Sequence, residues 1–186
     1  MEALQMYGEA LSIATALGYE TTANIARLNM SDLEFEMGNT ARAIELAEAV
    51  QFETRESCSE RVAGWALTQL SAFRVALADF AAARTTAREA IRLARGQSDI
   101  QLAIGIELLA TVAARIGDPR RAARIRGHVE AWYRRTGYIR QPTEQRNYES
   151  LMAALRANLS DAEIERLGAE GARLSEDQAV ADALAV

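Results

Sequence analysis

Apolar residues recur along most of the chain at the spacing of α-helices rather than that of strands. Residues 119–136 carry them on one side only, with Ala122, Ile125, Val129 and Trp132 forming a single stripe. Residues 99–116 are apolar on nearly every face, as expected of a helix that lies between neighbouring helices. The pattern therefore predicts an all-α protein built from helices packed side by side.

Three turn signals interrupt this pattern at nearly regular intervals. Each has Asn or Asp at the same point, and these residues, Asn39, Asp79 and Asp118, lie 40 and 39 positions apart. Both side chains are good helix N-caps, because their oxygens accept hydrogen bonds from free backbone N–H groups. Gly38 and Gly117, one position earlier, can adopt the left-handed backbone that ends a helix. Each signal predicts a tight turn between two helices.

The turns define a repeating pair of helices. An alanine follows each cap by one helical turn, and a large residue followed by a small one recurs in each preceding helix, which predicts a close packing seam. The seam residues are Ala43, Ala83 and Ala122, facing Met30-Ser31, Leu70-Ser71 and Leu109-Ala110. The predicted pairs are 22–37 with 40–56, 60–77 with 80–95, and 99–116 with 119–136.

These residues resemble tetratricopeptide repeats in a slightly lengthened form. The resemblance implies a right-handed superhelix of helical hairpins over residues 1–137, with a half repeat at 1–18 and full pairs at 22–56, 60–95 and 99–136. Residues 138–186 are expected to form a short C-terminal helical subdomain packed on the last repeat. A half repeat at the start leaves an apolar face, which predicts that further residues or another chain cover it.

The tail adds a second resemblance. The phrase "AARIRGHVEAW", with Gly127 in mid-helix, is followed by Pro142, Tyr148 and the closing phrase "AEGARLSEDQAVADAL". Together they resemble the C-terminal repeat region of large bacterial signalling ATPases and transcriptional regulators, of the AfsR, MalT and LuxR types and those associated with adenylate cyclase. Leu167 departs from the aromatic residue usual in that group. The resemblance implies the scaffold part of such a regulator, either as a fragment or as a stand-alone remnant.

Composition excludes several kinds of chemistry. All 21 basic residues are arginine, so neither a phosphate-binding loop with its lysine nor Schiff-base catalysis is available. One histidine and one cysteine cannot supply the ligands of a structural zinc site. We therefore expect no enzyme activity, no catalytic residue, no cofactor and no metal. A lone cysteine suits a cytoplasmic protein, and no apolar run is long enough to predict a membrane span.

Two residues, His128 and Cys58, are candidates for chemistry. His128 could act as a general base with Glu130, but no nucleophile or metal partner stands at a useful spacing, which favours a surface or partly packed histidine. Cys58 lies between serines at a predicted helix boundary, and a plain small residue is favoured there over a redox role.

Charge is distributed unevenly along the chain. Residues 115–146 contain nine arginines and three acids, whereas residues 1–60 contain eleven acids and three arginines. The basic region from Arg115 to Arg146 makes nucleic-acid binding an alternative function. A net charge of −5 and the lack of a recognisable reading helix argue against it. Pairing of the acidic end with the basic end, within or between copies, is favoured.

The first helix of each pair is expected to line a concave surface. This lining combines apolar and acidic groups and lacks the pattern that holds a C-terminal carboxylate, so it predicts a helix or extended peptide of basic and apolar character as partner. Its predicted residues are Leu28, Asp32, Phe35, Trp65, Thr68, Ala72, Glu107, Thr111 and Arg115.

The sequence thus predicts a non-catalytic protein–protein interaction scaffold in bacterial signal transduction or transcriptional regulation. The partner is expected to be a protein or peptide, including other domains of a longer chain. A stand-alone adaptor that forms a homodimer through the helix at residues 2–17 is the other prediction.

Overall fold

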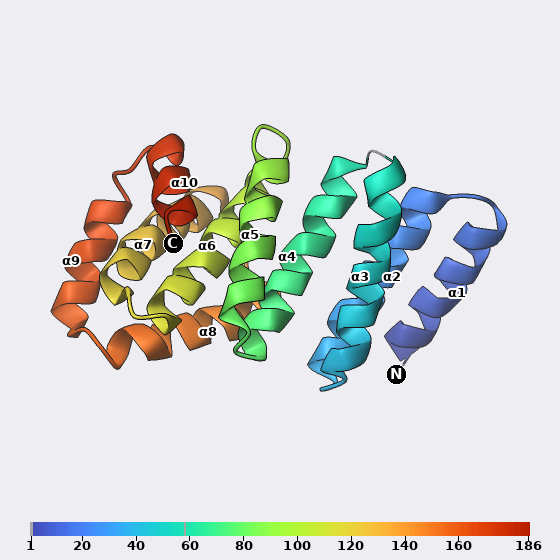
Figure 1. Cartoon of the computed structure of the whole chain (residues 1–186), viewed down its shortest axis with the longest axis horizontal. Coiled ribbons are helices and arrows are strands. Elements are labelled where there is room, and N and C mark those ends of the chain that lie inside the picture. The colour runs from blue at the N-terminus through green and yellow to red at the C-terminus, as the bar shows by residue number, and fades with distance from the viewer. Residues whose placement is uncertain (1, 58) are drawn as a thin grey trace.

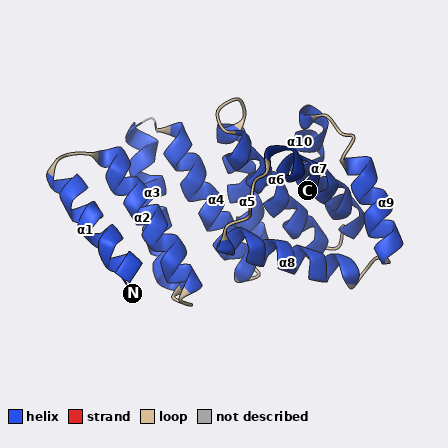
Figure 2. Cartoon of the chain, turned by 180° about the vertical axis from the view of Figure 1, so that it is seen from behind, coloured by secondary structure: helices blue, strands red, loops and turns tan. Residues whose placement is uncertain are grey.

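The structure is a computed structural model that describes residues 2–57 and 59–186 (Figure 1). Every regular element in these residues is a helix (Figure 2), which confirms the predicted all-α fold class. None of the described helices is long and apolar enough to cross a membrane. The helices are α1 (Glu2–Ala16), α2 (Glu20–Glu36), α3 (Thr40–Ser57), α4 (Glu60–Ala76), α5 (Phe80–Ala94), α6 (Asp99–Arg115), α7 (Pro119–Thr136), α8 (Pro142–Arg156), α9 (Asp161–Gly171) and α10 (Glu176–Leu184).

Helices α1 to α7 follow one another side by side along the molecule (Figure 1). Helix α4 contacts both α2 and α6, so these three helices share one side of the array. Helix α8 runs across that side, steeply inclined to its neighbours (Figure 2), and contacts α2, α4, α6 and α7. Helix α9 packs on α7, and α10 contacts α6 and α7.

The three predicted turns have similar backbone geometry. The residue before each Asn or Asp has a positive φ, of 87° at Gly38, 60° at Ala78 and 101° at Gly117. Asp79 then accepts a hydrogen bond from the backbone N–H of Ala82 at 3.1 Å, and Asp118 accepts the corresponding bond from Arg121 at 3.2 Å. The second turn therefore holds alanine in a conformation that glycine adopts without a steric penalty.

Replacing Ala78 with glycine should stabilise the protein. Removal of Cβ relieves the left-handed strain at this turn, which we expect to raise the free energy of unfolding by about 0.5–1 kcal/mol after the cost of a more flexible unfolded chain. Urea denaturation measures this change. Ala76→Gly, two positions earlier in the last turn of α4, is the matched control and should destabilise by a similar amount. Changes of the same sign in the free energy of unfolding of the two variants would contradict the prediction.

The small residues of the predicted seam lie where helices approach most closely. The hydroxyl of Ser31 donates to the carbonyl of Ala43 at 2.8 Å, and that of Ser71 donates to the carbonyl of Ala83 at 2.9 Å. Both serines are fully buried, and so are both alanines. In the third pair Ala110 takes the place of the serine and is equally buried. The repeat in the sequence is therefore a repeat in packing, because only a small side chain fits at this crossing.

Candidate binding pocket between helices α2, α4, α6 and α8

A pocket of about 480 Å³ lies on the side of the array that α8 crosses. Its walls come from α2, α4, α6, the start of α8 and the segment before α8, and Tyr7 of α1 contributes as well. One part of the lining is apolar, and another part consists of carboxyl and amide side chains. This combination of an apolar wall with a few convergent polar groups is typical of small-ligand sites.

Six of the nine residues predicted for a concave surface line this pocket. They lie at helical spacings on one face of α2 or α4, or in mid-α6, which brings them together. The six are Leu28, Asp32, Trp65, Thr68, Ala72 and Glu107.

The structure places the other three predicted residues elsewhere. Phe35 is 3% exposed and its ring packs on that of Phe73 at 4.5 Å. Thr111 is fully buried and donates to the backbone carbonyl of Glu107 at 3.0 Å. The Arg115 guanidinium lies over the ring of Phe80, 5.3 Å from its centroid. Phe35 lies between two lining residues of α2, Asp32 and Glu36, but its ring is buried, whereas Thr111 and Arg115 follow the lining residues of α6.

Asp32 is the first carboxyl of the polar wall. It accepts hydrogen bonds from Nε2 of Gln69 at 2.6 Å and from the hydroxyl of Thr143 at 3.4 Å, which join α2 to α4 and α8. Burial raises the pKa of Asp32 to about 6, and the nearby charge of Glu36 acts in the same direction. Hydrogen bonds from neutral donors oppose this rise only in part.

Glu144, in the first turn of α8, is the second carboxyl of the polar wall whose pKa is raised. It accepts a hydrogen bond from the hydroxyl of Tyr138 at 3.0 Å and another from the backbone N–H of Gln141 at 3.0 Å. Burial raises the pKa of Glu144 to about 7, and the charges of Glu107 and Asp32 add to that rise. Asp32 and Glu144 therefore both change charge near neutral pH.

These raised pKa values predict that stability falls as the pH rises. Between the unfolded values near 4 and the folded values of about 6 and about 7, the folded protein binds more protons than the unfolded chain. The free energy of unfolding should therefore be lower at about pH 8 than at about pH 5, by roughly 2–4 kcal/mol from the two groups. Urea denaturation at both pH values measures it.

The Asp32→Asn/Glu144→Gln variant tests the origin of this dependence. It removes both charges and leaves one acceptor oxygen in each side chain, where the carboxylate uses two. It should therefore be less dependent on pH than the wild type, and more stable at about pH 8 because no charge is buried. An unchanged dependence on pH in this variant would assign the effect to other groups.

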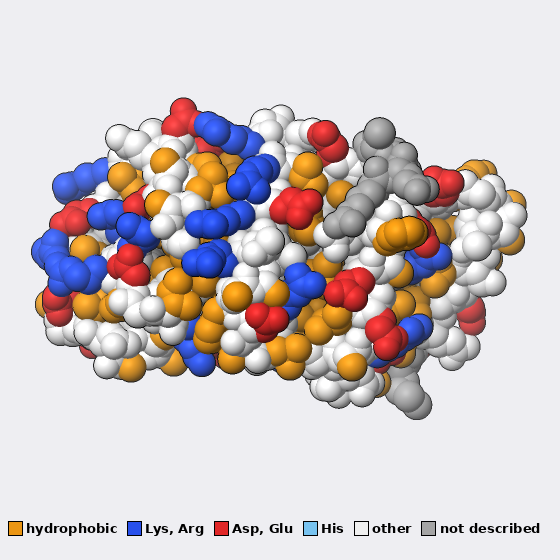
Figure 3. Space-filling model, viewed as in Figure 1, with side chains coloured by type: hydrophobic (Ala, Val, Ile, Leu, Met, Phe, Trp, Pro, Cys, Tyr) orange, Lys and Arg blue, Asp and Glu red, His pale blue; other side chains and the backbone are white. Residues whose placement is uncertain are grey.

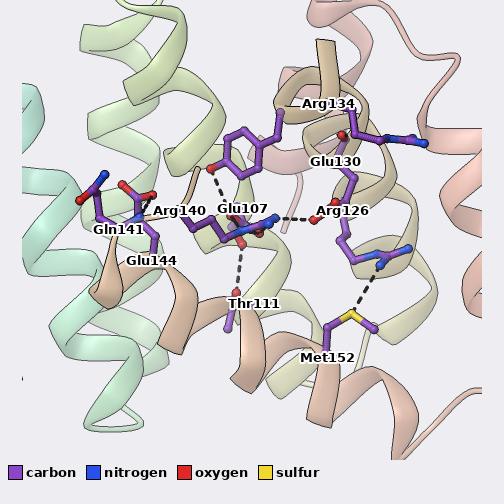
Figure 4. A network of polar contacts seen from close by, with 10 residues as sticks. Glu107, Thr111, Arg126, Glu130, Arg134, Arg140, Gln141, Glu144 and Met152 are labelled. Atoms are coloured by element: carbon purple, nitrogen blue, oxygen red, sulfur yellow. Dashed lines mark hydrogen bonds and ion pairs between the residues drawn. The ribbon is translucent and has the colours of Figure 1, made fainter. Parts of the chain in front are cut away.

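A buried ion-pair network adjoins the pocket (Figure 4). The guanidinium of Arg140, from the segment before α8, contacts both carboxylate oxygens of Glu107, with the shortest distance 2.6 Å, and also contacts Glu130 of α7. The hydroxyl of Tyr133 donates to Glu107 at 3.2 Å. Burial raises the pKa of Glu107, and the bonds from Arg140 oppose that rise.

Two tyrosine rings enclose the guanidinium of Arg140. It lies 4.5 Å from the ring centroid of Tyr133 and 3.9 Å from that of Tyr148. Burial alone would lower the pKa of Arg140, but the hydrogen bonds and charges of Glu107 and Glu130 outweigh it, so the pKa is raised and the cation persists. Glu107 is therefore already neutralised by the chain itself, whereas Asp32 and Glu144 are not.

Of the two candidates for chemistry, His128 does not line this pocket. His128 is half-buried on α7, where burial lowers its pKa and a hydrogen bond with the backbone of Leu174 acts against that. Cys58 lies outside the described residues. Among the residues that the structure describes, no three His, Cys, Asp or Glu side chains are grouped so as to hold a metal ion.

The basic region is partly neutralised within the fold. Arginines gather over the half of the molecule that holds α5, α7 and α9 (Figure 3). Arg124 makes two hydrogen bonds of 2.7 Å to Asp182 of α10, and Arg120 contacts Glu163 of α9 at 2.9 Å. With Arg121 and Arg140, four of the nine arginines between 115 and 146 contact carboxylates. These pairs join the tail to α7.

Sequence reasoning missed several residues of the pocket. Gln69 follows Trp65 by one helical turn, so its position on the pocket side of α4 was available from spacing. Thr143, Glu144 and Asn147 lie on α8 and line the pocket too. No local pattern could place them there, because their position depends on how α8 crosses α2 and α4.

Comparison with known proteins relates about half of the chain to mycobacterial proteins. Over 108 residues it is 32% identical to proteins of Mycobacterium bovis and Mycobacterium tuberculosis, each described as a "Putative HTH-type transcriptional regulator". The match covers 52% of this chain and 12% of each regulator. No family model matches the chain, nor does any solved structure.

The predicted resemblance to bacterial regulators is thus confirmed at the level of similarity to these proteins. Membership of the tetratricopeptide group stays a prediction.

Proposed function

We propose that this chain is a non-catalytic interaction scaffold, the helical-repeat part of a transcriptional regulator. The similarity to regulators over half the chain carries this proposal. The recurrent seam of Ser31 with Ala43 and Ser71 with Ala83 supports repeats of the tetratricopeptide type. Such arrays present a largely preformed surface, so binding needs no covalent step.

The pocket side of the array is the proposed contact surface for a protein partner. Trp65 and Ile25 line the pocket, and Ile25 is 42% exposed. Asp32, Glu36 and Glu144 add negative charge beside them. A segment of basic and apolar character complements this surface.

Peptide binding tests the proposal. Labelled peptides that combine arginine with leucine should bind more tightly than acidic peptides of equal length, as measured by fluorescence anisotropy. Ile25→Ser should weaken binding by about tenfold, and Phe52→Ser, which removes a 68% exposed ring on α3, should leave it unchanged. Failure of every peptide class to bind, or equal losses in the two variants, would contradict it.

An exposed stripe on α1 favours a second contact, between two copies of the chain. Large side chains on α1 and directly after its end are solvent-exposed, by 64% at Met6, 61% at Ile13 and 59% at Leu17. With Ala3 and Ala10, also exposed, they recur at alternating steps of three and four residues, the spacing of a two-helix seam. We propose that this stripe forms a homodimer.

Light scattering measures the oligomeric state directly. We expect the wild type to be a dimer and Ile13→Glu to be a monomer, because a carboxylate cannot be buried in an apolar seam without a partner. The exposed Phe52→Glu variant is the control and should remain dimeric. A monomeric wild type would contradict the dimer but not the peptide-binding scaffold.

A further inference from the structure

The polar wall of the pocket holds carboxyl groups that nothing in the described chain neutralises. Asp32, Glu36 and Glu144 all line it, and the ion pairs among the described residues include none of them. The charge of Glu36 acts on Asp32, and that of Asp32 acts on Glu144. Like charges repel one another, so a cation bound at this wall would stabilise it.

The side chain of Gln69 independently indicates a missing hydrogen-bond donor in the pocket. It lines the pocket, is 9% exposed, and donates from Nε2 both to Asp32 and to the backbone carbonyl of Leu28. Its Oε1 is buried and has no hydrogen-bond partner among the described residues. A buried acceptor without a donor costs free energy. An added N–H group beside Asp32 would relieve both the repulsion and this deficit.

The rest of the lining suits an apolar group of limited size. Trp65, Leu108 and Ile104 form part of an apolar wall, and tryptophan is the aromatic side chain that attracts cations most strongly. The volume of about 480 Å³ lies in the range of small-ligand sites. Beyond the pocket, Arg146 of α8 covers the ring of Phe35 at 4.9 Å. The volume of the pocket itself favours a compact ligand group.

We infer that the pocket binds an organic cation, an ammonium or guanidinium group on a short apolar stem. The cation lies against Asp32 and Glu144 and donates toward Gln69, while the stem packs on Trp65. This inference deepens the proposed function, since the same chemistry is offered by a free amine or by an arginine side chain of the bound partner. Glu107 takes no part because Arg140 already neutralises it.

The charged residues around Asp32 and Glu144 affect how binding depends on pH. Glu36 shares α2 with Asp32, and Arg61 of α4, an exposed residue, is the one guanidinium among the described residues of the lining. The neutralised pair of Glu107 and Arg140 lies beyond Glu144. Ionised Asp32 and Glu144 attract the cation and their protonated forms do not, so affinity should fall as the pH drops below about 7.

Small probes test the inference through the indole N–H signals of the two tryptophans. Phenethylamine and butylguanidine should shift the Trp65 signal in ¹H–¹⁵N spectra and leave that of Trp132, outside the pocket, in place. The neutral 2-phenylethanol should bind at least about tenfold more weakly than phenethylamine. Asp32→Asn/Glu144→Gln should reduce amine affinity by about tenfold or more, whereas Glu34→Gln, on α2 but outside the lining, should not.

A second experiment, with peptides, distinguishes a free amine from an arginine side chain of a protein partner as the source of the cation. A peptide with one arginine, compared with its citrulline counterpart, reports whether a partner side chain enters the pocket. Amine binding without peptide binding would support the inference and contradict the proposed protein partner. Equal binding of charged and neutral probes, or full amine affinity in the double variant, would overturn the inference whether or not peptides bind.

Discussion

Substituting alanine for Gly171 should lower the free energy of unfolding by about 3 kcal/mol, because it forces α7 and α9 apart. A Cβ at this position would lie 1.8 Å from the backbone carbonyl oxygen of Arg124, and one at Gly127 would lie 2.1 Å from that of Gly168. Both obstacles are backbone atoms, so no side-chain rotation relieves them. Urea denaturation measures the loss.

Hydrogen exchange shows which helices lose stability in the Gly171→Ala variant. Because each helix of such an array contacts mainly its neighbours, the amides of α9 and α10 should lose protection in Gly171→Ala while those of α2 to α5 keep theirs. Gly8→Ala is the matched control, since a Cβ at Gly8 meets nothing within 4 Å. Alanine there should be neutral or stabilising by up to about 1 kcal/mol. Similar stabilities for the two variants would contradict the close crossing.

The same glycines show what the sequence could and could not reveal. Gly127 in mid-helix and the phrase containing Gly171 were evident as features of the tail, but a glycine in a helix does not say which backbone approaches it. Gly127 and Gly168 are 41 positions apart, and the contact between them exists only once α9 has packed on α7. The glycines could therefore be noticed in the sequence, but the backbone segments that pack against them could not be predicted from it.

The turns were predicted well because each depends on neighbouring residues only. Asp79 and Asp118 cap their helices as predicted. The first turn differs in detail, since Asn39 donates through Nδ2 to Glu34 at 2.8 Å. Ala78, which takes the place of a glycine, had no signal in the sequence.

The pocket was accessible to sequence reasoning only where it follows helical periodicity. Spacing along α2 and α4 brings Asp32 and Trp65 to the same side, and both line the pocket. The tail was expected on the last repeat, and Thr143 of α8 in addition donates to Asp32 across 111 positions of sequence. That contact joins α8 to α2, and it depends on the path of the chain between α7 and α8.

This path depends in turn on the salt-bridge network that holds it. Arg140 lies in the segment between α7 and α8 and is bonded to α6 through Glu107 and to α7 through Glu130. In the sequence it was one of nine arginines in a basic region. In the structure its side chain is 13% exposed. Nothing in the sequence distinguished this buried arginine from the other eight.

Replacing Arg140 with methionine should therefore destabilise the protein by about 3–5 kcal/mol at neutral pH. The change leaves Glu107, whose side chain is 5% exposed, with no cation and with the Tyr133 hydroxyl as its remaining side-chain donor. Chemical denaturation measures the loss. Arg146→Met is the control, because that exposed arginine covers the ring of Phe35 and its loss should cost no more than about 1 kcal/mol.

Two further measurements separate the unpaired charge from lost packing. In Arg140→Met the pKa of Glu107 should rise further, and protonation below that pKa removes the buried charge. The difference in stability from the wild type should therefore shrink as the pH is lowered from about 8 to about 5. Adding Glu107→Gln to Arg140→Met should recover much of the loss at neutral pH, because an amide is cheaper to bury than an unpaired carboxylate. A deficit that neither acid nor the second substitution reduces would show that packing of Arg140 between Tyr133 and Tyr148, and not its charge, holds α8 in place.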